Sequence, residues 1–177
     1  MPKLSVEEKP FTIGVIGRIE FKQKQQDFFV RTLRKHAGLF ADCRTHLIGS
    51  GPDEQKLRKL IRGDSSFTFL PWQQDMEEEY EKLDMVVIPS RYEGVPLVML
   101  EALARGIPVI GSRRDGMQDI LPSDWTFTPE DSASLATTFS NVRKTWKQKI
   151  EQIQNRILEE HSLERFRTGF VKAVTQQ

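Results

Sequence analysis

Two carboxylates stand beside a segment that is suited to binding an anion. Glu93 and Glu101 are separated by seven residues, and between them a glycine turn leads into a helix opened by Pro96. Backbone N–H groups near Leu97 and Val98 would point out of the start of that helix and form an anion site. Carboxylates fit beside such a site if they face hydroxyls, as when a carboxylate holds a ribose. The alternative is that both glutamates are surface residues of an amphipathic helix, although its apolar residues place Glu101 near packed surface.

Cations follow the first expected strand, in the loop that begins at Gly17. Gly17 lets the backbone turn sharply after the strand. Arg18 offers a planar guanidinium and Lys24 a mobile ammonium, the two usual ways to hold a diphosphate. Lys22 stands in the same loop. Taken alone, the lysines are better interpreted as a solvated first turn of a helix, where cations are only mildly unfavourable.

A second glycine turn, Gly49-Ser50-Gly51, joins another expected strand to a helix. Glu54 stands where the dinucleotide fingerprint has its third glycine, and no phosphate loop of the Gly-Lys-Ser/Thr type follows. The turn is therefore explained equally well by ligand binding and by a tight connection that keeps side chains away from a nearby ligand.

Strands and helices alternate along the chain with short connections. The apolar patterns predict strands at residues 11–16, 43–48, 67–70, 84–89 and 107–110, and helices at residues 24–35, 52–61, 75–83, 96–105, from 132 onward and at 162–174. Gly106 is expected to cap one helix at its C-terminus and Asp131 another at its N-terminus. The alternation predicts an α/β fold, a Rossmann-like doubly wound parallel sheet with helices on both faces. Ligands of such sheets bind beyond the carboxyl ends of the strands. The loop that begins at Gly17, the turn that begins at Gly49 and the segment that contains Glu93 all lie there.

Composition excludes several classes of function. The 26 basic and 25 acidic residues leave a net charge of +1, which argues against a nucleic-acid partner and against a polybasic membrane anchor. No apolar run approaches the roughly 18 residues of a transmembrane segment. The single cysteine, Cys43, makes the cytosol the default compartment, and its spacing from the histidines predicts no metal site. Residues 1–10 are interpreted as a leader or interdomain linker and residues 11–177 as the domain.

In this order the motifs resemble those of the retaining group 1 glycosyltransferases of the GT-B fold. The segment from Pro89 to Ile110 is similar to their Glu-x7-Glu motif, and Gly17-Arg18, the Gly49-x-Gly51-Pro52 turn and the strand at 84–89 match as well. The resemblance covers residues 11 to about 140 and, loosely, the last helix. It implies one half of a GT-B enzyme, the donor-binding C-terminal domain, with the N-terminal acceptor-binding domain missing from this chain.

The resemblance also implies roles for individual residues. Arg18 and Lys24 would hold the diphosphate of a nucleoside diphosphate sugar, Glu93 would contact the sugar, and Glu101 would bind the ribose. The implied nucleotide-sugar site further includes backbone groups at Gly17, Gly94, Leu97 and Val98, with Leu70 and Pro71 facing the base. Arg18, Lys24 and Glu93 would be the catalytic residues.

Three positions depart from the family pattern. Many members place the lysine one residue nearer to the arginine and follow it with glycine, whereas here Lys24 is followed by Gln25. Lys22 is therefore a weaker alternative to Lys24 for this role. The family often has glycine where Pro71 stands, and a glycine pair where Asp115-Gly116 stands. These departures affect details of the expected pocket.

The expected reaction transfers a sugar to an acceptor hydroxyl with retention at the anomeric carbon, without metal or other cofactor. The isolated chain is expected to bind nucleotide without being active alone. The protein is expected in the cytoplasm, and any association with a membrane is expected to come from the missing domain. A non-catalytic nucleotide-binding module is the alternative, which the intact set of Arg18, Lys24, Glu93 and Glu101 disfavours. A nicotinamide-dependent oxidoreductase is disfavoured because no Gly-x-Gly-x-x-Gly follows the first strand.

Overall fold

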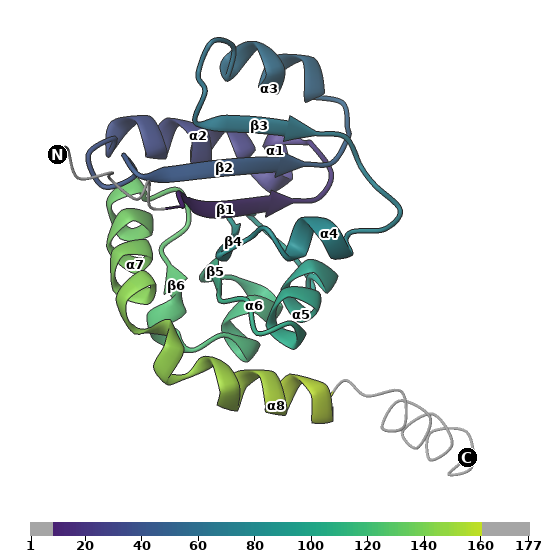
Figure 1. Ribbon diagram of the computed structural model, residues 1–177, viewed down its shortest axis with the longest axis vertical. Coiled ribbons are helices and arrows are strands. Elements are labelled where there is room, and N and C mark those ends of the chain that lie inside the picture. The colour runs from purple at the N-terminus through teal and green to yellow at the C-terminus, as the bar shows by residue number, and fades with distance from the viewer. Residues whose placement is uncertain (1–8, 161–177) are drawn as a thin grey trace, which may run out of the picture.

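Six strands form one parallel sheet in the computed structural model, which describes residues 9–160 (Figure 1). The strands are β1 (Phe11–Ile16), β2 (Cys43–Ile48), β3 (Phe67–Leu70), β4 (Met85–Ile88), β5 (Val109–Ser112) and β6 (Thr126–Phe127). Their order in the sheet is β3-β2-β1-β4-β5-β6, and every neighbouring pair is parallel. The order reverses between β1 and β4, and at such a switch point a crevice opens beyond the strand ends.

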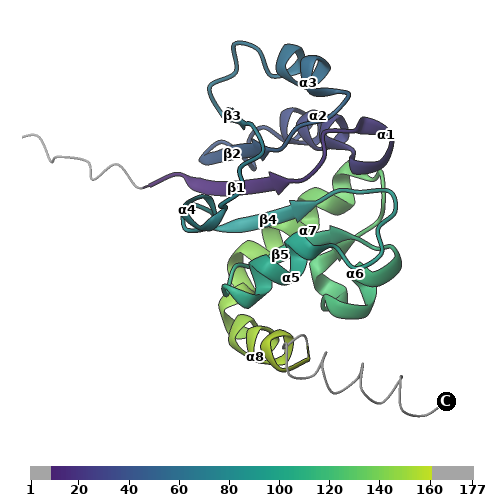
Figure 2. The ribbon, with the colours of Figure 1, turned by 90° about the vertical axis from the view of Figure 1, so that its right-hand side faces the viewer.

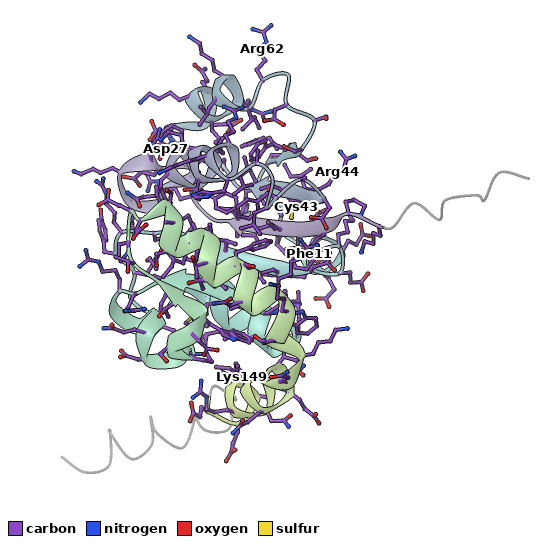
Figure 3. All side chains as sticks on the ribbon, turned by 90° about the vertical axis from the view of Figure 1, so that its left-hand side faces the viewer. Phe11, Asp27, Cys43, Arg44, Arg62 and Lys149 are labelled. Carbon is purple, nitrogen blue, oxygen red and sulfur yellow. The ribbon has the colours of Figure 1, made fainter. Side chains whose placement is uncertain are left out.

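Helices cover both faces of the sheet. They are α1 (Phe21–Lys24), α2 (Gln26–Lys35), α3 (Glu54–Leu60), α4 (Glu77–Tyr80), α5 (Leu97–Ala104), α6 (Asp115–Ile120), α7 (Ser132–Thr145) and α8 (Ile150–Glu160), with short 3-10 turns η1 (Ser123–Trp125) and η2 (Trp146–Gln148). Figure 2 views the face over which α5 lies, and α5 packs against α8. Figure 3 views the opposite face, which α7 crosses in contact with α2. The expected doubly wound α/β fold is thereby confirmed.

The central strands are apolar because both of their faces are covered. All four residues of β4 are buried, as are the four central residues of β1. Ile13 of β1, Val86 of β4, Met99 of α5 and Phe139 of α7 are fully buried. Each such side chain contributes roughly 1.5–3 kcal/mol to folding by leaving water, so the middle of the sheet is a rigid base for the loops at its carboxyl edge.

The two caps expected from the sequence are confirmed. The carboxylate of Asp131 accepts hydrogen bonds from the amides of Ala133 (2.9 Å) and Ser134 (3.0 Å) at the start of α7. Gly106 follows α5 with φ of 73°, the left-handed conformation that ends many helices. The two caps fix where α7 begins and where α5 ends.

The predicted helix at residues 24–35 is wrong in its first turn. Lys24 is instead the last residue of the short helix α1, and α2 begins at Gln26. The residue between them, Gln25, has φ of 54° and ψ of 35°. A non-glycine residue rarely adopts this left-handed conformation, so the sequence pattern continued the helix through it.

Other boundaries differ from the predicted ones by a few residues. The helix expected at 52–61 begins at Glu54, that expected at 75–83 is reduced to α4, and the strand expected at 107–110 lies at Val109–Ser112. α6 and β6 were not predicted, because their short segments show no clear apolar period. The helix expected at 162–174 lies outside the described residues. β1 begins at Phe11, and the division at residues 1–10 and 11–177 stays a prediction.

Candidate ligand-binding site

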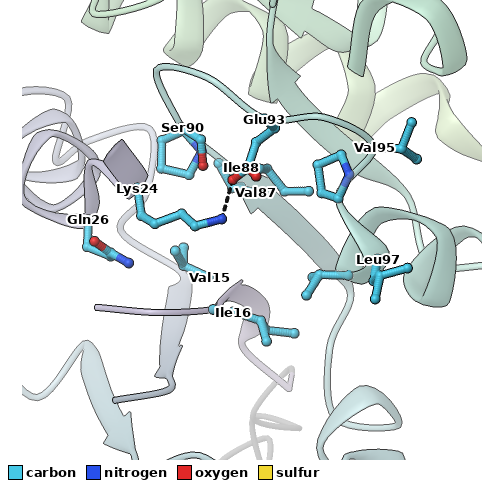
Figure 4. Close-up of a pocket in the computed structure, with 14 residues that line it drawn as sticks. Val15, Ile16, Lys24, Gln26, Val87, Ile88, Ser90, Glu93, Val95 and Leu97 are labelled. Atoms are coloured by element: carbon cyan, nitrogen blue, oxygen red, sulfur yellow. Dashed lines mark hydrogen bonds and ion pairs between the residues drawn. The ribbon is translucent and has the colours of Figure 1, made fainter. Parts of the chain in front are cut away.

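A cavity of about 270 Å³ opens at the switch point of the sheet, beyond the carboxyl ends of β1 and β4 (Figure 4). Its floor comes from the last residues of these two strands, and its walls come from the loops that follow them and from the first turn of α5. The lining residues include Gly17, Lys24, Gln26, Ser90, Glu93, Leu97 and Val98. The cavity lies where doubly wound folds bind their ligands.

An ion pair crosses the cavity. The ammonium of Lys24 donates to Oε1 of Glu93, and Figure 4 shows the two side chains extending toward each other from opposite walls. The Lys24 side chain is 23% exposed and that of Glu93 is 10% exposed. Because both groups are largely removed from water, their attraction is screened less than that of a surface pair. The sequence did not show that these two predicted site residues contact each other.

The left-handed conformation of Gln25 helps to place Lys24 in the cavity. It ends α1 immediately after Lys24 and starts α2 in a new direction. Lys22, the alternative cation, lies in the same short helix but is exposed and does not line the cavity. Gln25 thus adopts a left-handed backbone conformation that glycine would adopt without strain.

Polar contacts outside the cavity join its two walls. The amide of Arg91 donates to the carbonyl of Gln23 (2.8 Å), and Nε2 of Gln23 donates to the carbonyl of Tyr92 (3.2 Å). Oε1 of Glu130 accepts from Nε2 of Gln25 (3.0 Å) and from Nε of Arg91 (3.0 Å). The hydrogen bond from Arg91 is the main reason that the pKa of Glu130 lies below its usual value. These contacts hold α1, which carries Lys24, against the loop that carries Glu93.

The start of α5 presents backbone donors to the cavity. Pro96 precedes the helix with φ of −65°, and its carbonyl accepts from the amide of Met99 (3.0 Å). The amides of Leu97 and Val98 come before this first bond and have no acceptor within the helix. Both residues line the cavity. The partial positive charge of a helix N-terminus therefore faces the cavity, together with Lys24.

The glycines of the second turn are required by backbone packing. A Cβ on Gly49 would lie 1.9 Å from the carbonyl oxygen of Gly17, and one on Gly51 would lie 2.4 Å from that of Ile19. These two glycines thus keep side chains away from the backbone of the loop after β1. No nearby ligand is needed to explain them. Gly17 itself has φ of 142°, which favours glycine.

Three predicted site residues do not line the cavity. The Arg18 side chain is 67% exposed, with its Nε 3.4 Å from Oε2 of Glu20. Gly94 packs against α6, because a Cβ on Gly116 would lie 2.4 Å from the Gly94 carbonyl oxygen. Glu101 lies one helical turn beyond Leu97 on the same side of α5 and is exposed.

The expected base-binding segment lies at the end of β3. The carbonyl of Leu70 accepts a hydrogen bond from the amide of Gly49 (3.0 Å), and Pro71 is exposed. The carbonyl oxygen of Leu70 thus already accepts one hydrogen bond at the carboxyl edge of the sheet. The contact of these residues with a base stays a prediction.

Two further polar residues were missed by the sequence reasoning. Gln26 is 2% exposed, donates from Nε2 to the carbonyl of Arg18 (2.8 Å) and lines the cavity, while its Oε1 has no partner among the described residues. Tyr80 donates from its hydroxyl to Oε2 of Glu101 (2.7 Å). Neither contact has a local signal, because each joins residues from different elements.

The described residues also bear on metal binding and on membranes. Among residues 9–160, no three His, Cys, Asp or Glu side chains gather closely enough to hold a metal ion. In the same part of the chain, no helix is both long enough and apolar enough to cross a bilayer.

The chain belongs to a family of sugar-transferring enzymes. The sequence model of the family described as "Glycosyl transferases group 1" matches residues 10–144. A sulfoquinovosyl transferase of Arabidopsis thaliana is 32% identical over 148 residues, which are 78% of this chain and 28% of that protein. An uncharacterized glycosyltransferase of Haemophilus influenzae is 31% identical over 102 residues, 56% of this chain and 29% of that protein. The chain therefore spans less than a third of the length of these two relatives.

Solved structures of glycosyltransferases share the fold. The C-terminal domain of a group 1 family glycosyl transferase (LpcC) from Francisella tularensis superposes with a TM-score of 0.68 at 24% identity, covering 84% of each chain. HepE from Anabaena, crystallised with UDP and glucose, gives a TM-score of 0.84 at 17% identity over 96% of this chain and 49% of that one. The described fold thus corresponds to one half of a GT-B glycosyltransferase.

Proposed function

We propose that this chain binds the nucleoside diphosphate sugar donor of a retaining glycosyltransferase. The observation that carries the proposal is the cavity at the switch point, where Lys24, Glu93 and the N-terminus of α5 converge. A cation and free backbone amides suit a diphosphate, and a carboxylate suits the hydroxyls of a sugar. The UDP and glucose bound by the structurally similar HepE support this choice of ligand.

The proposed diphosphate site combines three sources of positive charge. Lys24 supplies an ammonium at the cavity wall and the first turn of α5 supplies the amides of Leu97 and Val98. Arg18 directly follows Gly17, which lines the cavity, and its exposed guanidinium is the third source. Glu93 holds the sugar. Glu101, which lies one turn beyond Leu97 in α5, holds the ribose.

In the proposed reaction, negative charge grows on the diphosphate as the bond to the anomeric carbon breaks. Lys24, Arg18 and the α5 N-terminus stabilise this charge in a partly enclosed site, the task that a metal ion performs in other enzymes. Glu93 orients the sugar and is not assigned the role of nucleophile. Retention at the anomeric carbon and independence from metal ions are parts of this proposal.

The acceptor is assigned to another domain. The chain covers about half of the HepE structure, which it matches over nearly its own full length. We therefore expect the isolated chain to bind the donor and to transfer no sugar by itself. A cytoplasmic location stays a prediction from the sequence.

Calorimetric titration with UDP, UDP-glucose and NAD in the presence of EDTA tests the proposal. UDP and UDP-glucose are expected to bind without added metal, and NAD is not. Arg18→Ala should weaken UDP about tenfold, the loss of roughly 1.4 kcal/mol, and leave uridine unaffected because uridine has no phosphate. Glu101→Ala should weaken uridine and UDP alike. Binding that requires magnesium or manganese would contradict the charge assignment.

Transfer assays on a full-length protein that contains this sequence distinguish an enzyme from a non-catalytic binding module. The enzyme is expected to lose transfer when Glu93→Ala is introduced, and a binding module would show no transfer before or after the change.

A further inference from the structure

Tyr80 and Glu101 form a contact that the proposed donor site does not yet explain. The Tyr80 hydroxyl donates to Oε2 of Glu101 at 2.7 Å, and this bond joins α4 to α5. Tyr80 is 2% exposed, whereas Glu101 is exposed. A buried phenol therefore holds one oxygen of a carboxylate whose other oxygen, Oε1, accepts no hydrogen bond from the described residues.

The phenol is fixed in its protonated, donating form. Burial raises the pKa of Tyr80 far above its usual value, and the hydrogen bond to Glu101 and the charge of Glu101 raise it further. A hydroxyl that cannot ionise at neutral pH has one proton to donate, and Glu101 receives it. The direction of the hydrogen bond is thereby set.

Arg105 holds the two helices in the register that this bond requires. Its guanidinium lies over the Tyr80 ring, 4.6 Å from the ring centroid. Nη1 of Arg105 donates to the carbonyl of Glu101 (3.1 Å), and Nη2 donates to Oε2 of Glu77 in α4 (2.6 Å). The tyrosine ring and the backbone of Glu101 are thus both tied to one guanidinium, which leaves the phenol little freedom to move away.

We propose that Tyr80 is a positioning residue that aims the Glu101 carboxylate at the ribose of the donor. The proposal rests on the proposed function, in which Glu101 binds that ribose. An exposed glutamate samples several side-chain rotamers, and fixing it costs conformational entropy. The bond to Tyr80 selects one rotamer before the ligand arrives and leaves Oε1 to accept from a ribose hydroxyl. Tyr80 therefore contributes to selection of ribose over deoxyribose without contacting the ligand.

Tyr80→Phe is the appropriate perturbation because it removes one oxygen and keeps the buried ring. In the wild-type chain we expect UDP to bind more tightly than 2′-deoxy-UDP. In Tyr80→Phe the affinity for UDP should fall three- to tenfold, while that for 2′-deoxy-UDP should change less than twofold. The preference for ribose should thus largely disappear, with the melting temperature of the chain recorded for each variant.

Two further variants sharpen the test. Tyr92→Phe is the matched control, since Tyr92 is half exposed and its hydroxyl has no hydrogen-bond partner among the described residues; it should keep the preference. In a Glu101→Ala background, Tyr80→Phe should have no further effect on UDP, because the group that it positions is absent.

The outcomes distinguish a failure of the proposed function from a failure of the positioning role of Tyr80. If the wild-type chain does not bind UDP, or does not prefer it to 2′-deoxy-UDP, the proposed function or its ribose assignment fails and the inference fails with it. If the wild type shows the preference and Tyr80→Phe keeps it, the inference alone is overturned. Equal weakening of both nucleotides would likewise overturn it, because that result indicates a general structural role.

A spectroscopic measurement tests the inference even if Tyr80→Phe does not fold. The chain has only two tyrosines, so a Tyr92→Phe variant labelled with 3-fluorotyrosine carries one fluorine, next to the Tyr80 hydroxyl. Addition of UDP should shift its ¹⁹F resonance through Glu101, and 2′-deoxy-UDP should shift it less. Identical shifts with the two nucleotides would contradict the positioning role.

Discussion

Replacement of Lys24 by methionine should destabilise the ligand-free chain, in addition to weakening donor binding. Methionine keeps most of the apolar length of the lysine and removes the ammonium that pairs with Glu93. Exposed ion pairs contribute about 0–1 kcal/mol, and hydrogen bonds to charged groups about 1.5–3 kcal/mol. With side-chain exposures of 23% and 10%, this pair is nearer the second class. We therefore expect the free energy of unfolding to fall by about 2 kcal/mol, a value within the second of these two ranges.

Urea denaturation followed by tryptophan fluorescence measures this loss. For a chain of this size the corresponding fall in melting temperature is about 4–8 °C, from about 2–4 °C per kcal/mol. Lys22→Met is the control, because Lys22 is exposed in the same short helix and does not line the cavity. It should change the free energy of unfolding by less than about 0.5 kcal/mol.

A double-mutant cycle shows whether the loss belongs to the pair. Glu93→Gln removes the charge that faces Lys24, so the variant with both changes should be more stable than the sum of the single effects predicts. We expect a coupling of about 1–2 kcal/mol, within the usual range for residues in contact. Additive effects, or an equal loss in Lys22→Met, would refute the reasoning from the ion pair.

Three further predictions concern Gln25, next to the candidate site, and two residues of β2, Cys43 and His46. Gln25→Gly should be more stable than Gln25→Ala by about 1 kcal/mol in chemical denaturation, because both lose the bond to Glu130 and only alanine keeps the strain of φ at 54°; equal stabilities would show that the conformation is not strained. Burial raises the pKa of the Cys43 thiol to about 12, so Ellman's reagent at pH 8 should react far more slowly with the native chain than in urea; fast native reaction would mean that the site opens. Burial lowers the pKa of His46, and the unfolded chain therefore binds more protons, so the free energy of unfolding should fall as pH drops below about 6.5; a His46→Gln variant with the same slope would contradict this origin.

The sequence was sufficient to predict the fold class and the edge of the sheet at which the cavity lies. Continuous apolar runs such as that of β4 mark strands buried on both faces, and their alternation with helices leaves few topologies. The segment around Glu93 could be placed beyond β4 because its pattern of a strand, a glycine turn and Pro96 is local. For the same reason Leu97 and Val98 were expected at the start of a helix, and the structure places both at the cavity.

Contacts between distant elements could not be read from the sequence. The Lys24–Glu93 pair joins residues 69 positions apart, and the Tyr80–Glu101 bond joins residues 21 positions apart. Gln25 was assigned to a helix because its left-handed conformation depends on tertiary contacts, among them its bond to Glu130 from a segment 105 residues away. The glycines at 49 and 51 were recognised, but their cause, the backbone of Gly17 and Ile19, is visible only in three dimensions.

Under the proposed function, the ion pair across the cavity also connects the stability of the ligand-free chain to its choice of ligand. Lys24 is neutralised by Glu93, so a diphosphate must compete with that carboxylate for the ammonium. In the proposed complex a nucleotide alone takes Lys24 and leaves the charge of Glu93 close to the phosphates, which is unfavourable. A nucleotide that carries a sugar also supplies hydroxyl donors, and these compensate Glu93 for the hydrogen bond that it has lost. In that proposed complex the pair would favour the complete donor over the nucleotide that remains after transfer, because the sugar hydroxyls of the complete donor can donate to Glu93 once the diphosphate has taken Lys24.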